Sequence, residues 1–416
     1  MEMSRQGGAE GESLLRLDQR ATVMPHGTHA PGWEGGEGER APFLRNEPVK
    51  LTPAWEGSNL PNDTLNLKGR LHSEPLRPFI DQWSLCIEVA IFVFTVIMAM
   101  VDTSGCPEVF FWLTMISVFL LNAFNAIFQN SVYGVAAKLP PRYTGSVVLG
   151  SNIAGCITVF INWISNEFAG SPRTSAIYYF IAGIFVLLAC FDTYFALPLN
   201  RFYRYHTTLE QRTFLANPAL AANQQNNPAL LRTPYLSILK LIWIQMYNVF
   251  ITFFVTLAVF PAVHSDVVSV NTDNYLGKSF VLVTCFLTFN VTATIGNITA
   301  GLWQMPSRRW LFVLTTTRLV FIPLFLVCNY QPQEGRTLAV LINNDVIYWI
   351  IAVIFGLTHG HASSLSMMYV SSNVAPEHAS KAGMLGAATL ITGILAGIAF
   401  SGLSADIVAA SIWKAT

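Results

Sequence analysis

Charged side chains are scarce in this sequence. Asp, Glu, Lys and Arg together make up 12% of the 416 residues, against roughly 25% in an average soluble domain. The formal net charge is zero, so the chain lacks both the basic surface that nucleic-acid binding requires and the acidic field that would attract cations. These shortages exclude an ordinary soluble domain, and no nucleic-acid partner is expected.

Cysteine pairs and catalytic motifs are also missing. The six cysteines include no CxxC pair, so the sequence gives no sign of a disulfide framework or a metal site. It contains no GxGxxG, P-loop, HExxH or GxSxG motif, and we therefore predict no enzymatic activity and no cofactor. Residue types alone leave one enzymatic alternative. This is an intramembrane hydrolase that uses Ser363 or Ser364 with His361.

The first 79 residues lack any apolar run that would form a signal peptide or a membrane span. They are rich in Gly, Pro, Glu and Arg, as in GWEGGEGERAPF, a composition typical of a disordered tail. The tail also contains EGESLL, an acidic-dileucine pattern of the kind that sorting adaptors bind, formed by Glu10, Leu14 and Leu15. We expect the plasma membrane as the location, with an endolysosomal membrane as the alternative.

Long apolar runs fill the rest of the chain, and 52% of all residues are hydrophobic. About 20 apolar residues are needed to cross a bilayer as a helix. The sequence therefore predicts an all-α polytopic membrane protein with about nine transmembrane helices, near residues 82–102, 109–137, 144–165, 175–197, 235–261, 279–303, 310–328, 346–370 and 381–409.

The longest connection, 200–234, divides the predicted spans into four over 80–199 and five over 235–410. Such a division suits two helix bundles that move relative to one another, and a plain connector is equally consistent with the composition. Lys and Arg are more frequent in the connections that share a side with the tail. By the positive-inside rule, the tail 1–79 and the linker are predicted to be cytoplasmic.

Polar residues follow one face of the second predicted span. Asn122, Asn125, Gln129 and Tyr133 are spaced by three, four and four residues, which places them on one helical stripe. An unpaired carboxamide in hydrocarbon costs several kcal/mol. The stripe therefore indicates either a solute-lined cavity or hydrogen bonding between helices.

The sixth predicted span repeats this spacing with Asn290, Thr294, Asn297 and Gly301. The shared spacing permits the two stripes to face each other. Asn290 and Asn297 also begin NVT and NIT patterns, which match the N-glycosylation acceptor, but their place in the middle of a span excludes modification.

Ionisable residues are rare within the predicted spans. Arg318 either pairs structurally with Glu88 or Asp192, or Arg318 and Glu88 contribute to a gate. His359 and His361 either take part in proton coupling or are satisfied by local hydrogen bonds.

Three further features are distinctive. They are the run FNAIFQNSVYGVAAKLPPRYT, the pair FPAV followed by CFLTFN, and the run TRLVFIPLFLVCN. Together they resemble the equilibrative nucleoside transporter family. The resemblance implies a major-facilitator-like two-bundle protein that moves nucleosides or nucleobases through a central cavity by alternating access. It also implies that Gln129 contacts the nucleobase, that Asn125 lies four residues before it, that Phe260 lies beside the cavity, and that Asn290 belongs to the site.

This sequence departs from the family pattern at two positions of the sixth span. Where relatives usually carry an aspartate and an arginine, it has Ala293 and Asn297. Alanine accepts no hydrogen bond through its side chain, so a nucleobase or another uncharged solute is favoured over ribose recognition of the usual kind. Ser151 and Asn152, both neutral, stand where a cation-carrying relative is expected to use a carboxylate.

Members of this family typically have eleven spans, and the resemblance here begins at the third. Two functions are therefore predicted. The first is facilitative transport of nucleosides or nucleobases. The alternative is a truncated, non-transporting family member that associates with or regulates a full-length transporter.

Overall fold

Long helices form almost everywhere that the sequence is apolar. The computed structural model describes residues 76–101, 105–206, 235–270, 276–332, 335–374 and 376–410, all of which belong to one unit. The predicted tail, with Glu10, Leu14 and Leu15, lies outside the described residues except for its last four positions, which are helical. Most of the predicted linker, 207–234, also lies outside them.

The first four helices are joined by short connections. Three of them begin at a proline, a residue that suits the first turn because its missing N–H has no partner there anyway. The last of the four ends in a short 3₁₀ turn, η2. The bounds are α4 Leu76–Met100, α5 Pro107–Ala136, α6 Pro141–Phe168, α7 Pro172–Ala196 and η2 Leu197–Leu199.

The second half of the described chain contains longer helices and several short ones. A π-helix, η5, runs directly into α12 and supplies the start of that span. The bounds are α10 Tyr235–Val259, α11 Ala262–Ser265, η4 Gly277–Ser279, η5 Leu282–Leu287, α12 Thr288–Leu302, α13 Leu311–Thr317, η6 Arg318–Val320, α14 Phe321–Leu326, α15 Asp345–Ser372 and α16 Pro376–Ala409.

Eight helices among the described residues are long and apolar enough to cross a membrane. They correspond to eight of the nine predicted windows. The remaining window, 310–328, contains a shorter apolar segment, Leu311–Leu326, in which a 3₁₀ turn separates α13 from α14. Pro323 lies in the first turn of α14, and because proline cannot donate to the carbonyl four residues before it, the α-helical ladder is interrupted here.

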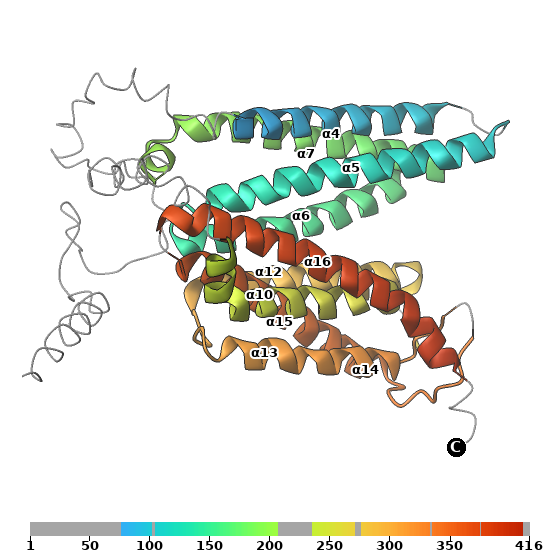
Figure 1. The fold of residues 1–416 in the computed structure, drawn as a ribbon. Coiled ribbons are helices and arrows are strands. Elements are labelled where there is room, and N and C mark those ends of the chain that lie inside the picture. Colours follow the sequence, from blue (N-terminus) through green and yellow to red (C-terminus); the bar gives the residue numbers. More distant parts are fainter. Residues whose placement is uncertain are drawn as a thin grey trace, which may run out of the picture. The chain divides into compact units, whose positions relative to one another are not determined.

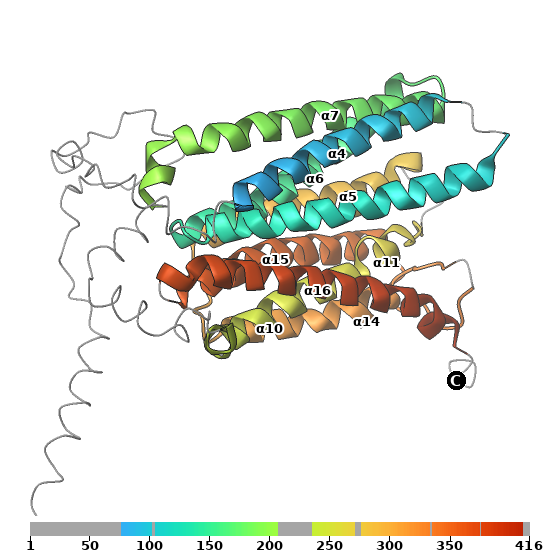
Figure 2. The same ribbon diagram turned by 45° about the horizontal axis from the view of Figure 1, so that its top comes forward.

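The helices pack as two groups, α4–α7 and α10–α16 (Figures 1 and 2). In the first group α4 lies against α5 and α7, and in the second α10 packs on α16 and α12 on α15. The groups meet where α5 contacts α16 and where α6 contacts both α12 and α15. The second group holds most of the buried residues. In the most apolar 18-residue stretch of each of its long helices, 33–50% of the residues are buried, compared with 0–17% in α4–α7.

Glycine permits the closest helix contact in the structure, between α12 and α15. A Cβ atom on Gly360 would collide with the Ala293 carbonyl, and one on Gly356 would collide with the Thr292 hydroxyl. On the opposite helix, a Cβ on Gly296 would meet the backbone of α15. The two backbones therefore touch directly, as small residues allow in membranes.

Replacing Gly360 by Ala should destabilise the protein by about 1–3 kcal/mol, because the added methyl group forces α12 away from α15. The measurement is thermal stability in detergent, read as the fraction that remains monodisperse after heating. Gly301→Ala on α12 is the control, since a Cβ there meets nothing within 4 Å. Equal stability of the two variants would contradict the close contact.

Candidate functional site

The polar face predicted on α12 lies at the junction between the two helix groups. Asn290 is buried and donates from Nδ2 to the Phe286 carbonyl in its own helix at 2.8 Å. Its side chain presses on α6 at Gly155, where a Cβ would collide with Oδ1. Thr294, one turn further on, has its hydroxyl 3.8 Å from the Cys156 thiol of α6.

Asn297 connects three helices. Its Nδ2 donates to the Val148 carbonyl of α6 at 3.5 Å, and its Oδ1 accepts from the Ser364 hydroxyl of α15 at 2.9 Å. The three predicted residues of α12 are therefore brought together against α6. This is the contact that must open if the two helix groups are to separate.

The polar stripe on α5 lies elsewhere. Asn122 and Asn125 are exposed, Gln129 is half-buried and Tyr133 is buried. The Asn122 amide donates to the Val118 carbonyl of its own helix at 2.8 Å. Because α5 packs on α4 and α16 while α12 packs on α15 and α6, the two stripes belong to helices with different main neighbours. Their sharing of one solute path stays a prediction.

Phe260 lies just beyond the end of α10, in an aromatic cluster. Its ring stacks on Phe289 with centroids 4.1 Å apart and an interplanar angle of 16°, and Phe286 meets it edge-on at 5.6 Å. Phe289 in turn lies 5.3 Å from the ring of His359. Phe260 is thus next to η5 and to Phe289, the residue that precedes Asn290 in α12.

Asn152 is a polar residue of this junction that the sequence analysis noted only as a neutral residue at the position of a relative's carboxylate. It lies on α6 one turn after Val148 and one turn before Cys156, the residues that contact Asn297 and Thr294. The side chain is 8% exposed and makes no hydrogen bond with the described residues. The i, i+4 spacing of these residues was the available signal, but the neighbours of α6 were unknown.

Arg318 is buried in η6 at 1% exposure. Its guanidinium donates to the Phe355 carbonyl at 3.3 Å and to the hydroxyls of Thr358 and Thr256 at 3.0 and 2.9 Å. It also lies 5.3 Å from the Phe355 ring centroid, within range of a cation–π interaction. Every one of these contacts is to α10 or α15, so the predicted pairing with Glu88 or Asp192 is wrong.

Glu88 lies on α4 and is 5% exposed. Its Oε1 atom has no hydrogen-bond partner among the described residues. Asp192 lies on α7 and is exposed. Burial of the Glu88 carboxyl group without a partner is costly, which is typical of a functional residue in a membrane protein. The gating role of Glu88 and Arg318 stays a prediction.

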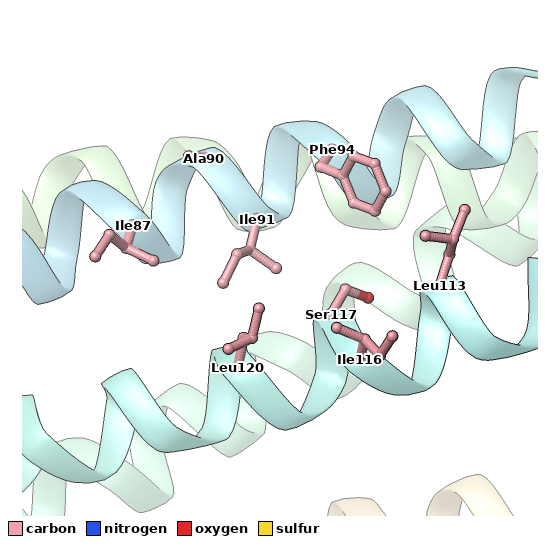
Figure 3. Close-up of a pocket in the computed structure, with 8 residues that line it drawn as sticks. All are labelled: Ile87, Ala90, Ile91, Phe94, Leu113, Ile116, Ser117 and Leu120. Atoms are coloured by element: carbon pink, nitrogen blue, oxygen red, sulfur yellow. The ribbon is translucent and has the colours of Figure 1, made fainter.

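An apolar cavity of about 340 Å³ lies between α4 and α5 (Figure 3). Seven apolar side chains and Ser117 line it, and the Ser117 hydroxyl donates to the Thr114 carbonyl of its own helix. The cavity therefore offers no free polar group to orient a polar solute, and none of the predicted site residues borders it.

Catalytic and metal-binding arrangements find no support among the described residues. The Ser363 hydroxyl donates to the Gly360 carbonyl, and that of Ser364 donates to Asn297. His361 instead contacts Thr299 and the Met305 carbonyl, so neither serine is paired with it as a hydrolase would require. In the described part of the chain, no group of three or more metal-ligating side chains occurs.

Comparison with known proteins identifies the family. A family model described as nucleoside transporter matches residues 115–404. The chain belongs to the nucleoside transporter family. Equilibrative nucleoside transporter 1 of Homo sapiens is 31% identical over 346 residues, which cover 78% of this chain and 75% of that protein. Equilibrative nucleoside transporter 2 of Mus musculus is 28% identical over 353 residues, covering 76% of each.

Membership of the nucleoside transporter family confirms the resemblance drawn from the sequence motifs. It also confirms that the protein is a transporter-family member and not an enzyme. The apolar helices of the described residues confirm an all-α, multi-pass membrane protein.

Ala293 stands where the family resemblance implies an acid. It is fully buried, with its backbone against Gly360 of α15. A carboxylate at this position would enter the closest helix contact in the structure, whereas alanine fits it. The side-chain acceptors on this part of α12 are therefore the neutral groups of Asn290, Thr294 and Asn297.

Replacing Arg318 by Lys should destabilise this nucleoside transporter family member by about 1–3 kcal/mol, because one ammonium group cannot reach the acceptors of both α10 and α15. Thermal unfolding in detergent measures the effect. Arg309→Lys, at an exposed arginine just before α13, is the matched control. If both variants unfold at the temperature of the parent protein, the Arg318 network does not hold η6.

Proposed function

We propose that this protein is a facilitative transporter that moves nucleosides or nucleobases across the membrane by alternating access. The observation that carries the proposal is the polar face of α12 at the junction of the two helix groups, in a chain of the nucleoside transporter family. A solute held at such a junction is exposed to one side of the membrane or the other as the groups rock.

The weakness of the α6–α12 contact supports movement there. Its polar contacts are a hydrogen bond of 3.5 Å from Asn297 and a thiol–hydroxyl contact of 3.8 Å at Thr294. A good hydrogen bond contributes only about 0.5–1.5 kcal/mol net, and these two are long. By contrast, α12 and α15 are in direct backbone contact through glycine, so we infer that they move together while α6 separates from α12.

The chemistry of the junction favours an uncharged solute. Each carboxamide supplies two N–H donors and one acceptor oxygen, which suits the edge of a nucleobase. Asn152 at the junction forms no side-chain hydrogen bond with the described residues, and neither do Asn125 and Gln129 on the separate polar stripe of α5. We infer that these groups are available to a solute. With Ala293 in place of an acid, recognition of the base is favoured over recognition of the ribose by a carboxylate.

Uptake into vesicles tests the proposal. The purified protein should mediate saturable uptake of radiolabelled uridine, adenosine or adenine, and Gln129→Ala should lower uptake by about tenfold because a solute hydrogen bond is lost in a desolvated site. Thr114→Val is the control on the same helix, since that hydroxyl donates only to the Phe110 carbonyl. No saturable uptake of any of the three solutes would contradict the proposal.

The alternative function is a non-transporting protein that associates with another member of the family. The exposure of α4–α7 favours this alternative. At most 17% of the residues in their apolar membrane-spanning stretches are buried, so these helices have surface available for helix contacts within the membrane. In this case the protein alone gives no uptake, but co-reconstitution changes the uptake rate of a transporting relative.

We propose that the N-terminal tail is cytoplasmic and that the protein resides in the plasma membrane. The acidic-dileucine pattern at Glu10, Leu14 and Leu15 would instead direct it to endolysosomes through an adaptor. Fluorescence imaging of the parent protein and of the Leu14→Ala, Leu15→Ala variant distinguishes the two locations. A shift of the variant from internal membranes to the cell surface supports adaptor binding, and identical distributions contradict it.

A further inference from the structure

Glycines bring the two helix groups into close contact at one end of the bundle. This is the end at which α5 and α15 finish and α6, α10 and α16 begin. We call it the linker end, because the predicted linker precedes α10 there. A Cβ atom on Gly383 of α16 would collide with the Ala137 side chain and with the Tyr133 carbonyl at the end of α5. A Cβ on Gly134 would lie 2.9 Å from Cγ of Met384. Glycine at both positions therefore lets α5 and α16 touch.

The contact between α6 and α15 at the linker end has the same character. A Cβ on Gly145, near the start of α6, would lie 2.9 Å from Sδ of Met368, near the end of α15. Both helix groups also contribute to one buried hydrophobic cluster, in which Tyr133 of α5 and Val148 of α6 belong with residues of α10, α15 and α16. The linker end is therefore closed by backbone and side chains of both groups.

The contact between α5 and α16 does not extend to the opposite end of the bundle. Figures 1 and 2 both show the two helices close together at the linker end and diverging away from it. Burial along α5 follows this divergence, because Tyr133, Gly134 and Ala136 in its last turn are buried, whereas Ser117 is the one buried residue in the rest of this helix. A Cβ on Gly402, near the far end of α16, would meet nothing within 4 Å. The two helices are thus joined at one end and spread apart at the other.

The polar stripe of α5 lies on the open side of this contact. Asn125 and Gln129 precede Tyr133 by about two turns and one turn, so the stripe ends where α5 meets α16. On α12, Asn297 donates to the carbonyl of Val148, which is a member of the buried cluster. The contact therefore lies between the stripe of α5 and the linker end of the bundle.

We propose that the contact of α5 with α16 is a gate, that the structure is the state in which the solute path is closed at the linker end and open at the opposite end, and that Gly134 and Gly383 allow the gate to close. This inference rests on the proposed transport function and assigns one step of it to named residues. Release of the solute toward the linker side requires α5 and α16 to part, and each new cycle requires them to touch again. A side chain at position 383 opposes the second step, because it meets the α5 backbone and not the flexible end of a side chain.

A reversible cross-link across the gate tests the proposal. A Cβ on Gly134 would lie 3.4 Å from Oγ of Ser380 in α16, a separation that suits a disulfide in the Gly134→Cys, Ser380→Cys variant. Oxidation should stop vesicle uptake of uridine, adenosine and adenine, and reduction should restore it. The purified cross-linked protein should still bind the transported solute, because the path stays open at the other end. Each single cysteine variant, oxidised in the same way, controls for the six native cysteines.

A second variant tests the role of glycine without a cross-link. Gly383→Ala should lower uptake about 5- to 150-fold, because overpacking opposes the closed state. Gly402→Ala is the matched control on α16 and should transport like the parent protein, since a Cβ there meets nothing within 4 Å. A cysteine in place of the buried Ser380 should also react faster with a maleimide in the Gly383→Ala protein than in the parent, because the gate is closed for less of the time.

The outcomes separate this inference from the proposed function. If the parent protein takes up none of the three solutes, the transport function fails. If the parent transports and the cross-linked protein transports equally well, transport stands and the gate is overturned. Loss of solute binding on cross-linking, or equal uptake by Gly383→Ala and Gly402→Ala, likewise overturns it. If the double cysteine variant does not fold, the comparison of the two alanine variants decides alone.

Discussion

Every polar side chain in this protein is subject to one constraint: hydrocarbon offers no hydrogen bonds. A carboxamide or hydroxyl at membrane depth must therefore be satisfied by its own helix, by a neighbouring helix or by a solute. Asn122 and Asn290 bond to carbonyls of their own helices. Asn297 uses neighbouring helices. No hydrogen bond to either kind of partner is formed by the side chains of Asn125, Gln129 and Asn152. A polar solute can supply the hydrogen bonds that these three side chains lack.

The same constraint explains why the helices of the second half of the described chain contact one another more closely than they contact α6. In the second half, α12 and α15 touch through glycines, and Arg318 joins η6 to α10 and α15 through its guanidinium donors. These direct contacts hold the second half together. The polar contacts between α12 and α6 are long, and they support our proposal that the two helix groups separate at this junction.

Much of the fold follows from the sequence because bilayer thickness sets the length of an apolar run. That rule located eight long helices, and it missed the break in the span over 310–328, where Arg318 bonds to other helices and Pro323 interrupts the ladder. Helical periodicity likewise identified the polar faces of α5 and α12. It could not identify the partners of each face, because packing between helices far apart in sequence leaves no local pattern.

Two features of the candidate site illustrate this limit. Asn152 was noted only as a neutral residue at the position of a relative's carboxylate. The contact of α6 with α12 is what places it beside the polar face of α12. His359 was noted as titratable, whereas the residue its Nδ1 contacts, Thr256 of α10, lies about a hundred residues away in the sequence. The family motifs supplied the functional class, but the departure at Ala293 acquires a physical reason only from the packing against Gly360.

The central claim is that transport requires α6 to separate from α12, and a reversible cross-link tests it most directly. Cys156 and Thr294 face each other across this contact, with Sγ and Oγ1 3.8 Å apart, so Thr294→Cys creates a pair that can be oxidised to a disulfide. Uptake by the same variant in vesicles is compared before oxidation, after oxidation and after reduction. The account predicts that the disulfide stops uptake and that reduction restores it. Undiminished uptake by the fully cross-linked protein would contradict the account.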